Sequence, residues 1–309
     1  MEYTYYPGCS LHSVNKQYDK SCKAVFEKLD VKLNELEDWN CCGATFYMSV
    51  DEITSLSIAA RNLALAEKSK NDLMAPCSSC FTVLSKTNRF LRRHEELHKN
   101  INSILQSIGL EYNLSVRVRH PLDILVNDVG FELIRMKVKH PLTGLRIANY
   151  YGCQIVRPEK GFDDRENPVT MDKLFEMLDA DSVYFPLKVK CCGAMSMITA
   201  EDVALKLIYE ILNTAIENDA DLIVTTCPLC QMNLEAYQDK VNKKFQTNLR
   251  IPIYYFTQVL GVALGIDDEK LGINNNFYIS EKLREISQAP MLTTIYDGPT
   301  DELKRRKIK

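Results

Sequence analysis

Apolar positions along the chain follow two different periods. Residues 14–29 and 53–64 repeat apolar side chains every three or four positions, which is the spacing of one face of a helix. Shorter apolar or alternating runs, the pattern of buried strands, occur at 31–33, 73–75, 115–119, 146–151, 182–185 and 222–226. Because strands and helices alternate, the pattern predicts an α/β fold with mostly parallel strand pairing.

The same order of elements occurs twice. Each half reads as strand, cysteine, helix, strand, Cys-Cys-Gly, helix, strand, Cys-x-x-Cys, helix, and Tyr5–Cys9 has its counterpart in Tyr150–Cys153. We therefore expect two tandem domains, residues 1–130 and 146–265, related by a pseudo-twofold axis. Each domain should hold a small, mostly parallel sheet flanked by helices, with cysteines at strand ends and the two cysteine groups facing each other across a cleft. Residues 266–309 contain no cysteine and form a C-terminal extension.

Polar residues mark several predicted helix starts. Ser49 with Glu52, and Thr199 with Asp202, have the three-residue spacing of a capping box, so we expect a capped helix after each Cys-Cys-Gly. Pro228 suits the first turn of the helix after the second Cys-x-x-Cys. A helix that begins at a Cys-x-x-Cys points its amino end toward the thiols, and this favours the negative charge of thiolates.

Ten of the eleven cysteines fall into two matching arrays of five. The first array is Cys9, Cys41, Cys42, Cys77 and Cys80, and the second is Cys153, Cys191, Cys192, Cys227 and Cys230. From the double cysteine onward the arrays keep one register, because Cys191 follows Cys41 by 150 residues and Cys227 follows Cys77 by 150 residues. The remaining thiol, Cys22, lies on an apolar helical stripe and is expected to be a buried core residue.

The arrays predict metal binding. Five thiols exceed the four ligands of tetrahedral zinc, and the planar peptide between adjacent cysteines turns their thiols apart. Thiolates without histidine select zinc, copper(I) or iron–sulfur clusters, and the surplus ligand favours a polynuclear iron cluster. Three alternatives remain: zinc, for example in one half, disulfides, and buried structural thiols. Disulfides are the least expected, because a 309-residue chain without a secretory signal has little need of them for stability. The glycine after each pair, Gly43 or Gly193, is expected to let the backbone approach the inorganic core.

These spacings fit the CCG domain pattern, C-x31-38-C-C-G-x33-34-C-x-x-C, and the chain resembles the B subunit of heterodisulfide reductase from methanogenic archaea over about residues 1–265. The resemblance implies that the ten cysteines hold two noncubane [4Fe-4S] clusters. It implies reduction of the coenzyme M–coenzyme B heterodisulfide to two thiols between these clusters. It also implies a complex with the heterodisulfide reductase C subunit, which carries cubane clusters, with the flavoprotein A subunit, and with a hydrogenase or formate dehydrogenase.

Composition narrows the class of protein. With 46% hydrophobic and 26% charged residues, the chain is expected to be soluble and globular, and its net charge of -3 gives no reason to expect nucleic acid as a partner. It has no run of 18 apolar residues, so no membrane span is expected, and the cytoplasm is the expected location.

Motifs that the chain lacks bear on its electron donor. We find no G-x-G-x-x-G, no P-loop and no ferredoxin run C-x-x-C-x-x-C-x-x-x-C-P, so electrons are expected to come from another polypeptide. The alternative function is that of an electron-transfer CCG-domain subunit of a 2-hydroxy-acid (lactate- or glycolate-type) oxidoreductase. The basic C-terminal tail and residues 89–99 are candidate docking surfaces.

The implied substrate carries sulfonate and phosphate groups, so it needs basic side chains near the clusters. The candidates are Lys188 and Lys190, just before the second Cys-Cys-Gly, and Arg157, four residues after Cys153. His120 stands at a predicted strand end, where ligands gather in open α/β sheets, and is a further candidate beside a purely structural role.

Overall fold

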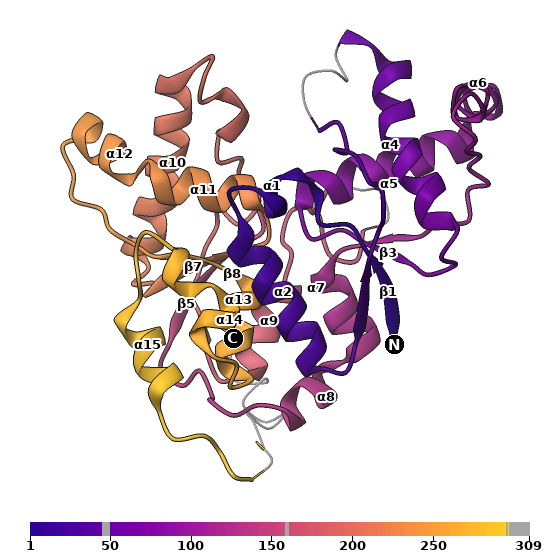
Figure 1. The fold of residues 1–309 in the computed structure, drawn as a ribbon. Helices are drawn as coiled ribbons and strands as arrows, with labels where there is room; N and C mark the ends of the chain where they lie inside the picture. Colours follow the sequence, from indigo (N-terminus) through magenta and orange to yellow (C-terminus); the bar gives the residue numbers. More distant parts are fainter. Residues whose placement is uncertain (45–49, 158–160, 295, 297–309) are drawn as a thin grey trace.

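The computed structural model describes residues 1–44, 50–157, 161–294 and 296. Two four-stranded sheets with the same strand order form its two halves (Figure 1). The first sheet has the order β2-β1-β3-β4 and consists of β1 (Glu2–Tyr5), β2 (Lys32–Glu35), β3 (Leu73–Met74) and β4 (Val118–Arg119). The second has the order β6-β5-β7-β8 and consists of β5 (Arg146–Tyr150), β6 (Asp181–Ser182), β7 (Leu222–Thr225) and β8 (Ile253–Tyr255). Every pair is parallel, so the α/β prediction with two repeated sheets is confirmed.

Helices flank both sheets (Figure 1). The first half contains α1 (Gly8–His12), α2 (Lys16–Lys28), α4 (Glu52–Glu67), α5 (Ser78–Arg93), α6 (Glu95–Gln106), α7 (Pro121–Ile124), a π-helix (Leu125–Val129) and α8 (Phe131–Met136). The second half contains α9 (Thr170–Met177), a 3-10 helix (Ala194–Ser196), α10 (Glu201–Glu217), α11 (Pro228–Ala236), α12 (Gln238–Phe245) and α13 (Phe256–Ala263). The extension adds α14 (Asp268–Leu271), a 3-10 helix (Ile273–Asn275) and α15 (Glu281–Gln288). None of the described helices is long and apolar enough to cross a bilayer.

The helix starts differ in part from the sequence prediction. Helix α4 is capped by Asp51, whose carboxylate accepts a hydrogen bond from the Thr54 backbone N–H at 3.0 Å, and Ser49 lies outside the described residues. The capping box predicted at Thr199 is wrong, because α10 has Ala200 at its N-cap with no side-chain cap. A 3-10 turn leads into α10 instead, and the Ala200 N–H donates to the Ser196 carbonyl at 2.7 Å. Pro228 occupies the first turn of α11 as predicted.

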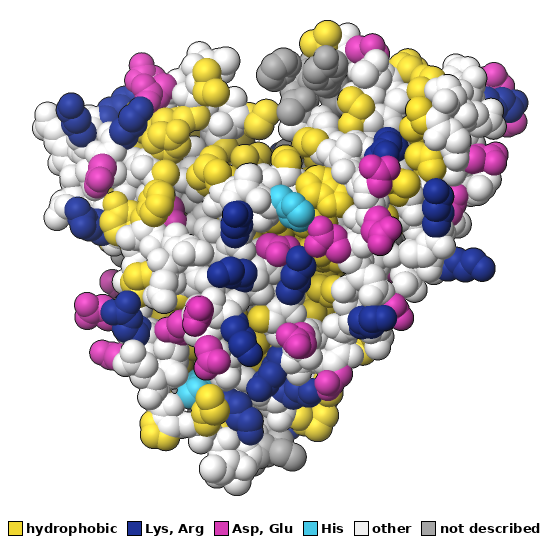
Figure 2. Space-filling model, in the orientation of Figure 1, with side chains coloured by type: hydrophobic (Ala, Val, Ile, Leu, Met, Phe, Trp, Pro, Cys, Tyr) yellow, Lys and Arg dark blue, Asp and Glu magenta, His cyan; other side chains and the backbone are white. Residues whose placement is uncertain are grey.

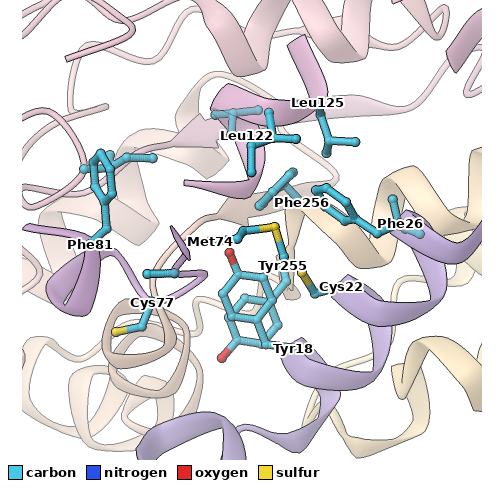
Figure 3. Close-up of a cluster of buried hydrophobic side chains, with 14 of the residues drawn as sticks. Tyr18, Cys22, Phe26, Met74, Cys77, Phe81, Leu122, Leu125, Tyr255 and Phe256 are labelled. Carbon is cyan, nitrogen blue, oxygen red and sulfur yellow. The ribbon is translucent and has the colours of Figure 1, made fainter. Parts of the chain in front are cut away.

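The two halves share one apolar core. Helix α2 of the first half packs against α13 and α14, which follow the second sheet. Figure 3 shows the centre of this contact, where the rings of Tyr18 and Tyr255 stack with centroids 4.1 Å apart and planes 4° from parallel. Cys22 is fully buried in the same cluster, which confirms its prediction as a core residue. The pseudo-twofold interface is therefore a packed core, and it fixes the two cysteine arrays relative to each other.

The extension packs against α2 of the first half and covers one side of the second half. The Asn276 side-chain amide donates to the Ile253 carbonyl at 2.8 Å, and the Gln258 amide donates to Asn276 at 2.9 Å. Ser280 caps α15 through its side chain, and its backbone N–H donates to the Tyr254 hydroxyl at 2.9 Å. These contacts give the second half a polypeptide cover for which the first half has no counterpart among the described residues.

Candidate metal centres

The fold gathers the cysteines at the carboxyl ends of the parallel strands. Cys9 follows β1 and Cys77 follows β3, while Cys153 follows β5 and Cys227 follows β7. Since these strands are neighbours in their sheets, the first cysteine of each array lies beside its Cys-x-x-Cys. This is the position in which open α/β sheets place ligand sites.

In the first array the thiols lie in contact pairs. The sulfur atoms of Cys42 and Cys80 are 3.3 Å apart, and those of Cys9 and Cys41 are 3.7 Å apart. A tetrahedral metal with bonds of about 2.3 Å to sulfur separates its sulfur ligands by about 3.8 Å, so the second spacing already fits two ligands of one metal atom. Cys9 and Cys41 are exposed, whereas the other thiols of this array are buried.

The second array repeats this arrangement. The sulfur atoms of Cys192 and Cys230 are 3.5 Å apart, and Cys153 interacts with Cys191, which raises the pKa of Cys153. The Gly193 backbone N–H donates to the Cys191 sulfur at 3.4 Å. Cys191 is exposed and Cys153 is partly exposed, so each array has a buried side and an accessible side.

The two arrays touch at the pseudo-twofold axis. Cys77 and Cys227 are neighbours whose thiols interact, since the pKa of Cys77 is raised and that of Cys227 is lowered by the other, and both side chains are buried. The Tyr18 hydroxyl lies between the backbone carbonyls just before these cysteines, 3.1 Å from Pro76 O and 3.2 Å from Thr226 O. The sequence predicts that the arrays face each other, but it gives no sign of this direct contact, because the contact depends on how the two halves pack.

Glycines before the first cysteine of each array make room for sulfur. Gly8 and Gly152 have φ of +71° and +70°, and a Cβ on either would lie 3.1 Å from the sulfur of Cys80 or Cys230, respectively. The role expected for Gly193, close approach to an inorganic core, stays a prediction, and the structure adds a packing reason for this glycine. A Cβ there would lie 2.9 Å from Ala204 Cα, so the close approach is to helix α10. The signal that could have identified Gly8 and Gly152 is the Gly-Cys step that both repeats contain.

The first cysteine of each adjacent pair, Cys41 or Cys191, has a lowered pKa that favours its thiolate form. Hydrogen bonds from the thiols of Cys42 and Cys9 lower the pKa of Cys41 to about 2. The Cys153 thiol and the Gly193 N–H lower the pKa of Cys191 to about 6, although burial acts in the opposite direction. At the interface, hydrogen bonds from Cys230 and Cys77 hold the pKa of Cys227 well below its usual range. Since metals bind thiolates, these shifts suit a metal-binding array.

The donor set fits a sulfur-rich metal group. All eleven cysteines are free thiols, and no histidine or carboxylate accompanies the ten array thiols in their contact pairs. Within the described part of the chain, no three Cys, His, Asp or Glu side chains converge as the ligands of one metal ion. Residues 45–49, which directly follow the first Cys-Cys-Gly, lie outside that part.

Two of the four candidate substrate residues are paired with acidic side chains. Lys188 donates to Asp172 at 2.7 Å and to the Pro168 carbonyl at 3.1 Å, and both members of this ion pair are largely buried. Lys190 is paired with Glu210. Arg157 donates to the Cys153 carbonyl at 3.0 Å through Nε and remains exposed, so it is the candidate cation with accessible donors beside the second array.

His120 occupies a structural position. It is fully buried, its Nε2 lies 3.0 Å from the Pro76 carbonyl, and its Nδ1 accepts from the Leu122 N–H at 3.1 Å. Burial lowers the pKa of His120 to about 4, so the ring is neutral at physiological pH. Through Pro76 it supports the backbone that leads into Cys77.

Comparisons with known proteins agree with this geometry. The cysteine-rich CCG domain family matches residues 3–85 and 147–235. The chain is 37% identical to the 8-methylmenaquinol:fumarate reductase membrane anchor subunit of Wolinella succinogenes, over 91% of this chain and 99% of that protein. It is 32% identical to the B subunit of the ferredoxin:CoB-CoM heterodisulfide reductase of Methanosarcina mazei, over 87% of this chain and 91% of that one.

A solved structure shares the fold. The crystal structure of a hypothetical protein from Helicobacter pylori superposes with a TM-score of 0.75 at 16% sequence identity, covering 90% of this chain and 52% of that chain. At this level of identity the likeness concerns the fold alone. Two matched CCG domains and relatives of nearly equal length show that the chain belongs to the CCG cysteine-rich domain family, among proteins similar to the B subunit of heterodisulfide reductase.

Proposed function

We propose that the chain is an iron–sulfur subunit of a multisubunit oxidoreductase, in which the two arrays hold two noncubane [4Fe-4S] clusters. The observation that carries the proposal is the contact between Cys77 and Cys227, which joins two complete five-thiol arrays in one buried interface. When bound, such clusters supply one-electron transfer. The chain itself supplies the thiolates, spaces them through Gly8 and Gly152, and keeps Cys42, Cys77 and Cys80 away from solvent.

Reduction of the coenzyme M–coenzyme B heterodisulfide is one candidate reaction. It is supported by the heterodisulfide reductase relatives and by the completeness of both arrays. In this reaction the S–S bond takes up two electrons and two protons and yields two thiols. Arg157 would bind an anionic group of the substrate, because it is exposed and bonded to the backbone of Cys153.

Electron transfer from a quinol toward a fumarate-reducing partner is the second candidate, and we favour it. The Wolinella relative, which is named for this reaction, matches almost end to end. Lys188 and Lys190 are paired with Asp172 and Glu210, so of the candidate cations beside the second array Arg157 is left to meet the sulfonate and the phosphate of the disulfide. In this reaction the chain would be an electron-transfer subunit, as in the alternative function considered from the sequence. Its partner would be linked to a quinol, however, and would not be a 2-hydroxy-acid dehydrogenase.

Apolar side chains near the exposed thiols also favour an apolar reductant. Val14, five residues after Cys9 in the sequence, is 67% exposed, and Ile198, seven residues after Cys191, is 97% exposed. Figure 2 shows hydrophobic side chains gathered along the hollow between the lobe of α10 to α12 and the lobe of α4 to α6. Such a surface suits the apolar ring and tail of a quinol better than it suits a sulfonate or a phosphate.

In either reaction the chain works with partner subunits. Partners related to the cubane-cluster C subunit and the flavoprotein A subunit, or to a fumarate-reducing subunit, would exchange electrons with it. A reducing compartment such as the cytoplasm suits eleven free thiols.

The two reactions can be separated by assay. The intact complex, purified without oxygen, is given either a menaquinol analogue with fumarate or a reduced viologen with the heterodisulfide. We expect quinol-dependent fumarate reduction, with loss of that activity in Cys77→Ser. If the complex reduced the heterodisulfide but not fumarate, the favoured reaction would be overturned and the first candidate established. Full turnover by the isolated chain with a flavin or a nicotinamide would refute both.

A further inference from the structure

A cavity of about 790 Å³ lies beside helix α5 in the first half, and no cysteine is among its described lining residues. Its walls come from α5, from the segment that contains β4, from α7 and the π-helix, and from Gly161 and Phe162 of the second half. The arginines that line it are Arg89, Arg92, Arg93, Arg117 and Arg119. Its acidic lining residues are Asp123 and Asp128. Among the described lining residues, Arg89 and Arg93 have partners of their own, and the remaining three arginines against two acids leave a surplus of one positive charge, whereas the whole chain carries -3.

Arg119 neutralises the acidic side of the cavity. Its buried guanidinium bonds to Asp128 at 3.0 Å and is also paired with Asp123. Burial alone would raise the pKa of Asp128, but hydrogen bonds from Arg119 and Tyr3, together with the charges of Arg119 and Arg117, hold that pKa below its usual value. The acids are thus paired within the protein, and Arg92 and Arg117 are exposed guanidinium groups of the lining, although Arg92 also donates through Nε to Asn88 Oδ1 at 3.1 Å and through Nη2 to the Leu114 carbonyl.

Aromatic rings form another wall. Phe81 and Phe162 both line the cavity, one from each half of the chain. The buried His120 supports them, with ring centroids 5.7 Å from Phe81 and 6.4 Å from Phe162, the latter nearly parallel. A ligand in this space can therefore place a flat apolar group against carbon and its charged groups against guanidinium.

The internal repeat shows that the arginines do not serve the shared metal-binding framework. At the register of 150 residues, Ser85, Arg89 and Arg92 are matched by Glu235, Asp239 and Asn242. The sheet registers pair Val118 with Leu73 and Ile253 with Ile223, so Arg117 and Arg119 are matched by Pro252 and Tyr254.

The corresponding region of the second half is covered by the chain's own extension. There the Phe277 N–H donates to Glu235 at 3.0 Å, and the Ser280 N–H donates to the Tyr254 hydroxyl at 2.9 Å. The first half keeps an arginine-lined cavity at the equivalent place. A property present in one repeat only is one that the common metal chemistry does not require.

We propose that this cavity binds a phosphate-bearing small molecule of nucleotide size. Its phosphates would contact Arg92 and Arg117, and its planar ring would lie against Phe81 and Phe162. The volume falls within the range of about 300–1,000 Å³ typical of small-molecule sites. Guanidinium groups match phosphate oxygens in bidentate geometry, and the polar lining residues Ser85 and Asn127 offer partners for hydroxyl or ring atoms. The site contains no glycine-rich phosphate-binding motif. The feature that indicates phosphate binding is the group of arginines that the fold brings together. The proposal does not depend on which redox reaction the clusters serve.

The test uses isothermal titration calorimetry on the anaerobically purified chain with its metal bound, with ADP and inorganic pyrophosphate as probes. We expect ADP to bind with a Kd below about 0.1 mM at low salt, and pyrophosphate to bind more weakly because it lacks the ring. Arg117→Gln should weaken ADP binding about tenfold or more. Ser85→Glu, which imports the residue of the second half, should abolish it by repulsion. Arg250→Gln, an equal loss of charge in the second half, should leave it unchanged.

Several results would overturn the proposal. These are no heat of binding with ADP at millimolar concentration, or equal affinity in the wild type, Arg117→Gln and Ser85→Glu. Binding of a hexaglutamate peptide without binding of ADP would instead make the cavity a docking place for an acidic protein segment. Because Ser85 is half-buried on the surface of α5, its variant gives a folded protein for the test even if Arg117→Gln is unstable.

Discussion

Gly8→Ala tests whether the glycine before Cys9 makes room for the sulfur of Cys80. A Cβ on Gly8 would lie 3.1 Å from that sulfur, whereas ordinary contact begins at 3.4 Å, so the sulfur must move by at least 3.4 minus 3.1, or 0.3 Å. Metal–ligand distances tolerate deviations of about 0.2 Å, so this displacement is enough to weaken one ligand of the first cluster. The backbone adds a separate cost of roughly 1–2 kcal/mol, because φ at Gly8 is +71°.

Gly109→Ala is the matched control. Gly109 also has a φ of +71°, but a Cβ there would meet nothing within 4 Å. Both variants should therefore lose about 1–2 kcal/mol of unfolding free energy, and only Gly8→Ala should lose metal. The assay is iron and acid-labile sulfide content after anaerobic purification, with electron paramagnetic resonance spectra of the clusters.

We expect Gly8→Ala to fall from about eight irons per chain to about four, with the signal of one cluster lost. Gly152→Ala should remove the other signal, because its Cβ would lie equally close to Cys230. Full iron content in Gly8→Ala, or equal loss in Gly109→Ala, would show that the contact with sulfur is not what fixes glycine at this position.

The remaining predictions concern ligands, ion pairs and pH. Cys42→Ser should damage one cluster and spare the other, and Cys192→Ser should do the reverse; loss of both signals in one variant would mean that the clusters do not assemble independently. Lys188→Met should destabilise the chain by about 2 kcal/mol in chemical denaturation, because it leaves Asp172 buried without its ion pair, and Lys190→Met should cost less than about 1 kcal/mol, because that pair is a third exposed. A raised Michaelis constant with unchanged stability would instead give these lysines a substrate role. Burial raises the pKa of Glu235 to about 7, above its unfolded value of 4.5, so the folded state holds the proton more tightly and stability should fall as pH rises from about 4.5 through 7, by at most about 3 kcal/mol. Glu235→Gln should flatten this dependence of Tm on pH, and an unchanged pH profile would contradict the assignment.

The sequence predicts the framework of this protein because the framework depends on local pattern. Strand ends such as Tyr5 and Thr225 lead into cysteines in both repeats, and parallel pairing then brings the arrays to one edge of each sheet. Pro228 and the apolar stripe that carries Cys22 are equally local signals, and both are confirmed.

Features that depend on distant parts of the chain escape such reasoning. Lys188 and Lys190 resemble free cations in sequence, but the fold supplies partners 16 and 20 residues away. The contact of Cys77 with Cys227 depends on the packing of the two halves, which the Tyr18–Tyr255 stack fixes. Likewise, the arginines of α5 and of the β4 segment share a cavity only after folding. At Thr199, a backbone turn leads into α10 and makes a side-chain cap unnecessary.

The central claim is that ten cysteines hold two polynuclear iron clusters. It is tested most directly by measuring iron, acid-labile sulfide and zinc per chain in protein purified without oxygen. We predict about eight irons and about eight sulfides with no stoichiometric zinc. One or two zincs per chain with no labile sulfide would contradict the claim, and would mean that the paired thiols form tetrahedral zinc sites.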